Sequence, residues 1–164
     1  MKKTSVTLLS LAALLLPLSA GAEGWQNLYM ADTGGSRMMQ TDDPAQADEI
    51  LAAVDSADGA RLIVTCPAQD GQIWVQIGQL ESTDGPDYLD GDSVVSFSVD
   101  GAAPVAAEPR GFMQSAYHAT VPEALIASLK AGKLLVMRYG PGADAQKEFS
   151  LSGSARALDA AKCQ

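Results

Sequence analysis

The stretch that most constrains the fold of this chain is residues 61–80, which also carries one of its two cysteines. Residues 61–66 are rich in Leu, Ile and Val with little polar alternation, which predicts a central strand covered on both faces. Pro67 and Asp70-Gly71 predict a turn. In the segment that follows, branched apolar residues take every second position over 73–77, as in a half-buried strand. The stretch therefore predicts two paired strands within a sheet.

The first 22 residues have the pattern of a cleaved export signal. Lys2 and Lys3 precede an apolar run over residues 6–18, and Ala20-Gly21-Ala22 fits the small-residue rule for cleavage after Ala22. The run is short for a membrane-spanning helix, and no cysteine follows the small residues as a lipoprotein signal would need. We expect a signal peptide over 1–22, one exported domain over 23–164, and no membrane anchor after cleavage.

The charge of the chain narrows the range of partners. It has 20 acidic against 11 basic residues, for a formal net charge of −9. Such a chain would be repelled by nucleic acid and by anionic membranes, so neither is expected as a partner. The charge is compatible with a basic protein partner or a cation, and equally with a surface that only keeps an exported protein soluble.

The two cysteines, Cys66 and Cys163, predict one disulfide, because an exported chain folds in an oxidising compartment. That bond would tie the end of the chain to the centre of the sheet. Two distant cysteines and the one histidine, His118, do not supply a metal site, so we expect no metal and no cofactor.

Short strands joined by turns account for most of the remaining chain. We expect strands at 24–31, 37–40, 93–100, 112–119, 134–139 and 147–151. Asp100-Gly101 is a hairpin signal, whereas residues 102–110, with two prolines, fit either an edge strand or an irregular connection.

Three helices interrupt these strands. Asp43 and Pro44 predict the start of a helix over 44–56, whose apolar residues recur at i, i+3, i+4 and i+7. The capping-box spacing of Thr120 and Glu123 predicts a second helix, stopped by Gly132. Its expected buried face is Pro122, Leu125, Ile126 and Leu129. A third helix over 153–162 is expected to face inward with Ala155 and Leu158.

These elements predict an α+β fold: one antiparallel, β-rich domain, either a sheet or a small sandwich, with about three short helices and one disulfide.

The polar face of the predicted strand at 72–77 is a candidate interaction surface. Gln72, Trp74 and Gln76 share that face, and an aromatic side chain among polar ones can mark a partner surface. The alternative is that a helix covers Trp74, and the helix expected over 44–56 is the nearest choice.

The loop over residues 81–92 gathers five carboxylates and is a possible weak calcium site. Its candidate ligands are Asp84, Asp87, Asp90 and Asp92. Their spacing differs from that of an EF-hand, and a solvated acidic loop is the alternative.

No recognised catalytic motif is present. His118 is expected near a strand end in contact with solvent, no Gly-x-Ser-x-Gly elbow or Ser-x-x-Lys motif occurs, and no glycine-rich loop opens a helix. We therefore expect no catalytic residues and no enzyme.

The C-terminal hundred residues resemble, in pattern, some small exported proteins of Gram-negative bacteria. The residues concerned are Leu62-x-Val64-x-Cys66, then Ala124-Leu125-x-x-x-Leu129-x-x-Gly132-x-Leu134-x-Val136, and Phe149-x-Leu151-x-Gly153-x-x-x-Ala157-Leu158 with Cys163. Similar endings occur in the invasion-associated locus B family and in the TagO-like accessory proteins of type VI secretion. The resemblance implies a disulfide-containing, non-enzymatic protein of the periplasm, or a secreted one, and it carries no catalytic residue.

These observations favour a non-enzymatic envelope protein that binds another protein, as a secretion- or envelope-associated accessory. One alternative is an inhibitor of a basic hydrolase such as lysozyme, although the inhibitor motif Ser-Gly-x-x-Tyr fails here because Arg156 takes the position of the tyrosine after Ser152-Gly153. A second alternative is an uncharacterised hydrolase that uses His118 or the carboxylates of residues 81–92.

Overall fold

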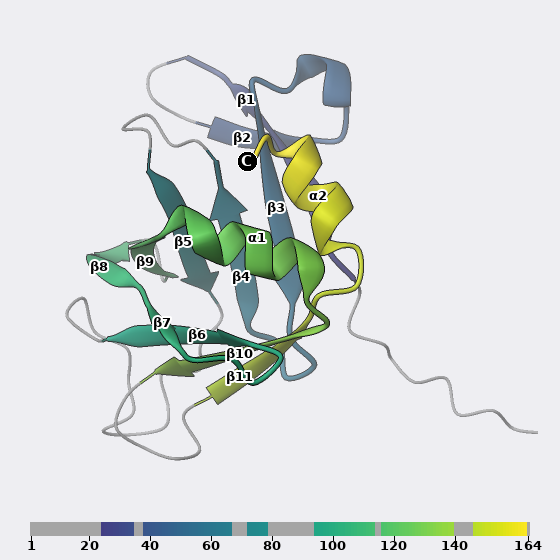
Figure 1. Cartoon of the computed structure of the whole chain (residues 1–164). Helices are drawn as coiled ribbons and strands as arrows, with labels where there is room; N and C mark the ends of the chain where they lie inside the picture. Colours follow the sequence, from purple (N-terminus) through teal and green to yellow (C-terminus); the bar gives the residue numbers. More distant parts are fainter. Residues whose placement is uncertain are drawn as a thin grey trace, which may run out of the picture.

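The computed structural model describes residues 24–34, 38–66, 72–78, 94–113, 116–139 and 146–163. In these parts of the chain, two antiparallel sheets and two α-helices enclose one hydrophobic core (Figure 1). The expected signal peptide, 1–22, lies outside the described residues, as do the turn at 67–71 and the acidic loop over 81–92.

The larger sheet has seven strands in the order β2-β1-β3-β4-β5-β9-β8, and every neighbouring pair is antiparallel. Its strands are β1 (Gln26–Asp32), β2 (Met38–Thr41), β3 (Glu49–Asp55), β4 (Arg61–Thr65), β5 (Ile73–Gly78), β8 (Glu108–Met113) and β9 (Ala116–Val121). The predicted pair at 61–66 and 72–77 is confirmed, and β4 is the middle strand of the sheet.

The smaller sheet has the order β11-β10-β6-β7. It consists of β6 (Val95–Val99), β7 (Val105–Ala106), β10 (Leu134–Tyr139) and β11 (Gln146–Ser150). Asp100 and Gly101, with φ of 50° and 76°, form the predicted turn between β6 and β7. Only Ala107 separates β7 from β8, so the ambiguous segment 102–110 carries the chain from one sheet to the other.

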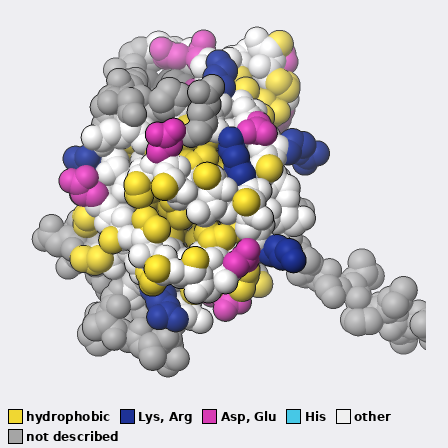
Figure 2. Space-filling view, viewed as in Figure 1, with side chains coloured by type: hydrophobic (Ala, Val, Ile, Leu, Met, Phe, Trp, Pro, Cys, Tyr) yellow, Lys and Arg dark blue, Asp and Glu magenta, His cyan; other side chains and the backbone are white. Residues whose placement is uncertain are grey.

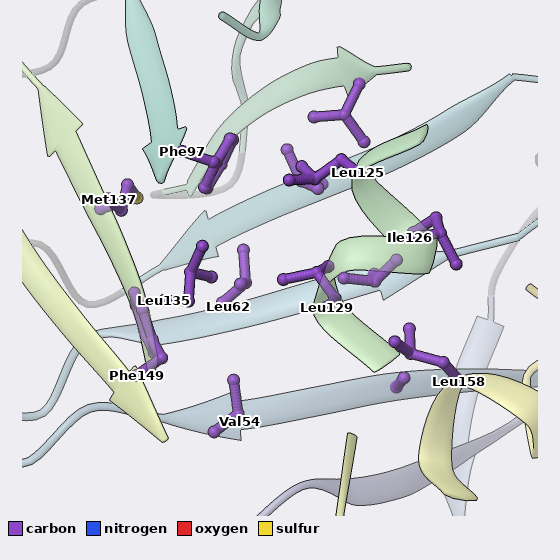
Figure 3. Close-up of a cluster of buried hydrophobic side chains, with 14 of the residues drawn as sticks. Val54, Leu62, Phe97, Leu125, Ile126, Leu129, Leu135, Met137, Phe149 and Leu158 are labelled. Carbon is purple, nitrogen blue, oxygen red and sulfur yellow. The ribbon is translucent and has the colours of Figure 1, made fainter. Parts of the chain in front are cut away.

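Both α-helices, α1 (Glu123–Ala131) and α2 (Ser154–Ala160), pack on the same face of the larger sheet (Figure 1). The core lies between that face, the helices and the smaller sheet (Figure 3). Its largest fully buried side chains include Leu62, Phe97, Tyr117, Ile126, Leu129, Leu135, Met137, Phe149 and Leu158. Figure 2 shows hydrophobic atoms over α1, whose outward residues Ala124, Ala127 and Ala131 are exposed.

The prediction of a helix over 44–56 is wrong. Asp43 does accept a hydrogen bond from the Ala45 amide, but it begins only a 3-10 turn, η1 (Pro44–Gln46). The rest forms β3, which lies between β1 and β4 with Ala52, Ala53 and Val54 fully buried. A short apolar run buried on both faces suits a central strand as well as a helix, and pairing with two neighbours decided between them.

Smaller corrections concern burial and boundaries. β4 alternates between buried and half-buried side chains, because only one of its faces meets the core. The strand predicted over 112–119 is divided between β8 and β9. Thr120 does not cap α1, whose N-cap is the exposed Pro122 with no side-chain hydrogen bond. In α2, Ala155 is exposed, and Ser154 and Ala157 are buried with Leu158.

Candidate functional site

The outer face of the larger sheet is the first candidate surface. Residues opposite one another on paired strands point to the same side of a sheet. Trp74 lies opposite Thr65 and Thr120, and Gln76 lies opposite Ile63 and His118. On the other half of the sheet, Leu28 lies opposite Leu51, and the register places both on this same side. We use the name outer face for the surface formed by the following residues: Leu28, Leu51, Ile63, Thr65, Trp74, Gln76, His118 and Thr120.

The outer face contains four large apolar side chains on four adjacent strands. Leu28, Leu51, Ile63 and Trp74 are all half-buried. Both described helices lie on the opposite side of the sheet, against core residues such as Leu62 and Val54 (Figures 1 and 3). The helix expected to cover Trp74 is strand β3, so among the described elements no helix covers this face.

A cavity of about 820 Å³ lies where β5 begins, β9 ends and α1 starts. It is lined by Cys66, Gln72, Ile73, Ala106, Glu108, Thr120, Val121, Pro122, Glu123 and Lys162. Of the predicted interaction surface, Gln72 therefore lines the cavity, whereas Trp74 and Gln76 lie further along the outer face. Thr120 belongs to both, because it lines the cavity and lies opposite Trp74.

Polar contacts connect one wall of the cavity. Arg110 Nη2 donates to Gln72 Oε1 at 2.7 Å, and this nitrogen also lies 3.5 Å from Glu108 Oε2. Thr120 is only 7 % exposed, and its hydroxyl donates to Glu108 Oε2 over a long distance of 3.4 Å. Glu108 is thus held by two weak contacts rather than by one close ion pair.

The predicted disulfide between Cys66 and Cys163 is confirmed, with a Cα–Cα distance of 4.9 Å. It joins the residue after β4 to the third residue after α2, and Cys163 is buried. A buried disulfide between such distant residues is typical of proteins that fold outside the reducing cytosol.

Two ion pairs involve the β3–β4 hairpin, one between Asp55 and Arg61 and one between Asp58 and Lys147. Arg61 donates to both carboxylate oxygens of Asp55, at 2.6 and 2.7 Å, and this hydrogen bonding lowers the pKa of Asp55 and raises that of Arg61. Burial tends to raise the pKa of Asp58, but hydrogen bonds from Lys147 and Ser56 outweigh it, and the net shift is downward.

His118 lies inside β9 rather than near a strand end, and it is half-buried between Gln76 and Gly111 on the neighbouring strands. Hydrogen bonds of the sheet ladder placed it there, whereas the sequence suggested solvent contact. The described residues contain no group of three or more His, Cys, Asp or Glu side chains that could hold a metal ion. Asp84, Asp87, Asp90 and Asp92, the candidate calcium ligands, lie outside the described residues.

Sequence patterns did not indicate the cavity. Its charged residues Glu108, Glu123 and Lys162 come from β8, from α1 and from the second position after α2, which are far apart in the chain. The positive φ of 58° at Lys162 is likewise visible only in the structure.

Comparison with protein-family models, characterised proteins and solved structures found no match for this chain. Among the described residues, no helix is long and apolar enough to cross a membrane.

Proposed function

We propose that this chain is a non-enzymatic protein of the Gram-negative periplasm or cell envelope that acts by binding another protein, in a secretion- or envelope-associated role. The resemblance of its C-terminal hundred residues to small exported proteins supports the compartment, and the Cys66–Cys163 disulfide agrees with it. The observation that carries the binding role is the outer face. Its four large apolar side chains share a side of the sheet that neither described helix covers.

The composition of the outer face suits a protein interface. Apolar side chains lie beside uncharged polar ones such as Gln76 and Thr65, and interfaces combine an apolar centre with polar groups around it. Tryptophan is among the residues that contribute most to such interfaces, and Trp74 lies on β5, inside the sheet rather than at its edge. A sheet held by hydrogen bonds on both sides loses little conformational freedom on binding, which favours affinity.

Site-specific photo-crosslinking in the native host tests this proposal. A photoreactive residue at Gln76, beside Trp74 on the outer face, should give a defined adduct with one protein. The matched control position is Glu148, an exposed residue of β11 in the smaller sheet, which should give no such adduct. Trp74→Ala or Leu51→Ala should abolish the adduct while the circular dichroism spectrum stays unchanged.

The proposal fails if the adduct forms equally from position 148, or if it persists in both outer-face variants. An adduct with a basic hydrolase such as lysozyme, together with loss of that enzyme's activity, would identify the protein as an inhibitor instead of an accessory.

A further inference from the structure

We infer that the cavity beside the Cys66–Cys163 disulfide binds a basic side chain, lysine or arginine, of the protein partner. This inference rests on the proposed function and adds the chemistry of the partner. The partner presents an exposed basic side chain with an apolar stem, next to the part of its own surface that contacts Trp74. The inference depends on the apolar part of the cavity lining, on the charges of the cavity and on its connection to the outer face.

Part of the cavity lining is apolar. It includes Cys66 of the disulfide, Ile73, Ala106 and Val121, together with polar side chains. Lysine and arginine bury their methylene stems against apolar surface while the charged end stays among polar groups. A volume of about 820 Å³ lies within the range of protein binding pockets and exceeds the volume of one side chain, so a residue with part of its backbone fits.

Two carboxylates on different walls remain available for a ligand cation. Glu123 forms no ion pair with any described residue, although it lines the cavity at the start of α1. Glu108 has Arg110 only at 3.5 Å, because that guanidinium is closer to Gln72. Hydrogen bonds between a cation and a carboxylate are about twice as strong as those between neutral groups, so a basic side chain gains most at these two positions.

Lys162 lines the cavity from a strained backbone position. The amides of Lys162 and Cys163 donate to the carbonyl oxygens of Asp159 and Leu158, which is the Schellman pattern at a helix end. The left-handed position in that pattern usually holds glycine, but here it holds Lys162, with φ of 58°. A side chain kept at an unfavourable backbone conformation is a common feature of functional sites.

The charges around Lys162 favour a cation overall. Lys162 also lines a neighbouring cavity of about 210 Å³, which contains Asp48 and Glu49. The two cavities together hold more carboxylates than cations, in a chain whose net charge is −9. The resulting negative potential attracts a basic group and repels an acidic one. Lys162 then competes with the incoming cation, so its removal should strengthen binding.

Continuity with the outer face favours a protein partner over a free amine. Thr120 lines the cavity and lies opposite Trp74. Gln72 also lines the cavity, and it comes two positions before Trp74 in the sequence. A partner that lies across Trp74 can therefore insert a side chain into the cavity from the same binding position.

The test uses the full exported domain, labelled with nitrogen-15, and three small probes followed by amide chemical shifts. The probes are acetyl-Leu-Lys-Leu-amide, acetyl-Leu-Gln-Leu-amide and 1,5-diaminopentane. The lysine peptide should shift the amides of Ala106, Val121, Glu123 and Lys162, and should bind at least tenfold more tightly than the glutamine peptide. The double change Glu108→Gln/Glu123→Gln should weaken the lysine peptide at least tenfold, whereas Glu148→Gln, on β11, should leave it unchanged.

Lys162→Gln is the deciding variant, because it should tighten binding of the lysine peptide several-fold. Weaker binding of the lysine peptide in Lys162→Gln would overturn the inference, because Lys162 would then assist the ligand rather than compete with it. Equal binding of the lysine and glutamine peptides would overturn it as well, and tighter binding of 1,5-diaminopentane would assign the cavity to free amines. If no adduct forms from position 76 but the lysine peptide binds, only the outer-face proposal is refuted. If the adduct forms but the lysine peptide does not bind, only the inference about the cavity is refuted.

Discussion

Lys130 of α1 and Asp159 of α2 form an ion pair, with Nζ and Oδ1 2.6 Å apart, and the same ammonium donates to the Cys163 carbonyl oxygen at 2.5 Å. Elsewhere along the two helices, the buried Ser154 hydroxyl donates to the Leu129 carbonyl oxygen at 2.7 Å. The two helices are therefore joined to each other by polar contacts, and the chain end is held by both helix α1 and the disulfide.

The Lys130 contacts should be measurable in the free energy of unfolding. Lys130→Met keeps much of the aliphatic stem but loses the ion pair and the bond to Cys163, which should cost about 1 kcal/mol. Urea denaturation gives this value, and Lys133→Met is the matched control because the Lys133 side chain is exposed. Equal midpoints for the two variants would contradict the role of Lys130.

Removal of the disulfide should have a larger effect. The bond joins residues 97 positions apart, and Cys66→Ala/Cys163→Ala should lower the free energy of unfolding by about 2–4 kcal/mol because the unfolded chain is no longer constrained. Calorimetry should show a lower melting temperature, and wild-type protein reduced with dithiothreitol should melt near the same temperature as the variant. A variant that melts with the oxidised wild type would refute this prediction.

Acid should destabilise the protein in part through Asp55. Its pKa is lowered from the ordinary value of 3.8, mainly by the hydrogen bond from Arg61. The unfolded state then takes up protons before the folded state does, so this stabilisation is fully present above about pH 4–5 and is lost as the pH falls through the lowered pKa. In Asp55→Asn, unfolding midpoints measured from pH 7 to pH 2 should be lower at neutral pH and fall less steeply in acid. A curve parallel to that of the wild type would count against this contribution.

Gly132, which ends α1, is required by close packing rather than by its backbone angles, since its φ is −83°. A Cβ there would clash with Val99 Cγ1 and approach Leu151 Cδ1 to 3.0 Å. Gly132→Ala should therefore cost about 1–3 kcal/mol in urea denaturation, as overpacking does. If the clash is the cause, Val99→Ala in the same chain should cost less in the Gly132→Ala background than alone.

Lys162 offers a prediction in the opposite direction. Lys162→Gly should stabilise the fold by about 1 kcal/mol, because glycine adopts the left-handed conformation without steric cost. Lys162→Ala should give no such gain, since alanine meets the same strain. Thermal denaturation of the two variants separates the backbone effect from the loss of the lysine charge, and equal melting temperatures would rule out backbone strain.

Much of the fold could be predicted where one local pattern had one explanation. Strict alternation in β5 predicted a strand with the correct buried side, and the Asp100-Gly101 turn followed from residues that tolerate positive φ. The pairing of Cys66 with Cys163 followed from their number and the expected compartment. These features depend on a few neighbouring residues or on composition, so tertiary contacts had little to change.

Residues 49–55 show the limit of such reasoning. Their apolar spacing fits one face of a helix, but it fits a strand buried on both sides equally well, and only the neighbours β1 and β4 removed the ambiguity. That single difference decided the candidate site too, because the helix expected over Trp74 became a strand of the same sheet, separated from β5 by β4.

The sequence by itself therefore determined the β-rich class, most strand positions and the disulfide, since these follow from local periodicity and cysteine number. Only the tertiary structure decided which side of the larger sheet both helices cover, and it alone brought Glu108, Glu123 and Lys162 around one cavity. The physical reason is that a cavity, and the choice of which sheet face the described helices cover, depend on how separate elements pack, and periodicity within one element contains no information about its neighbours in space.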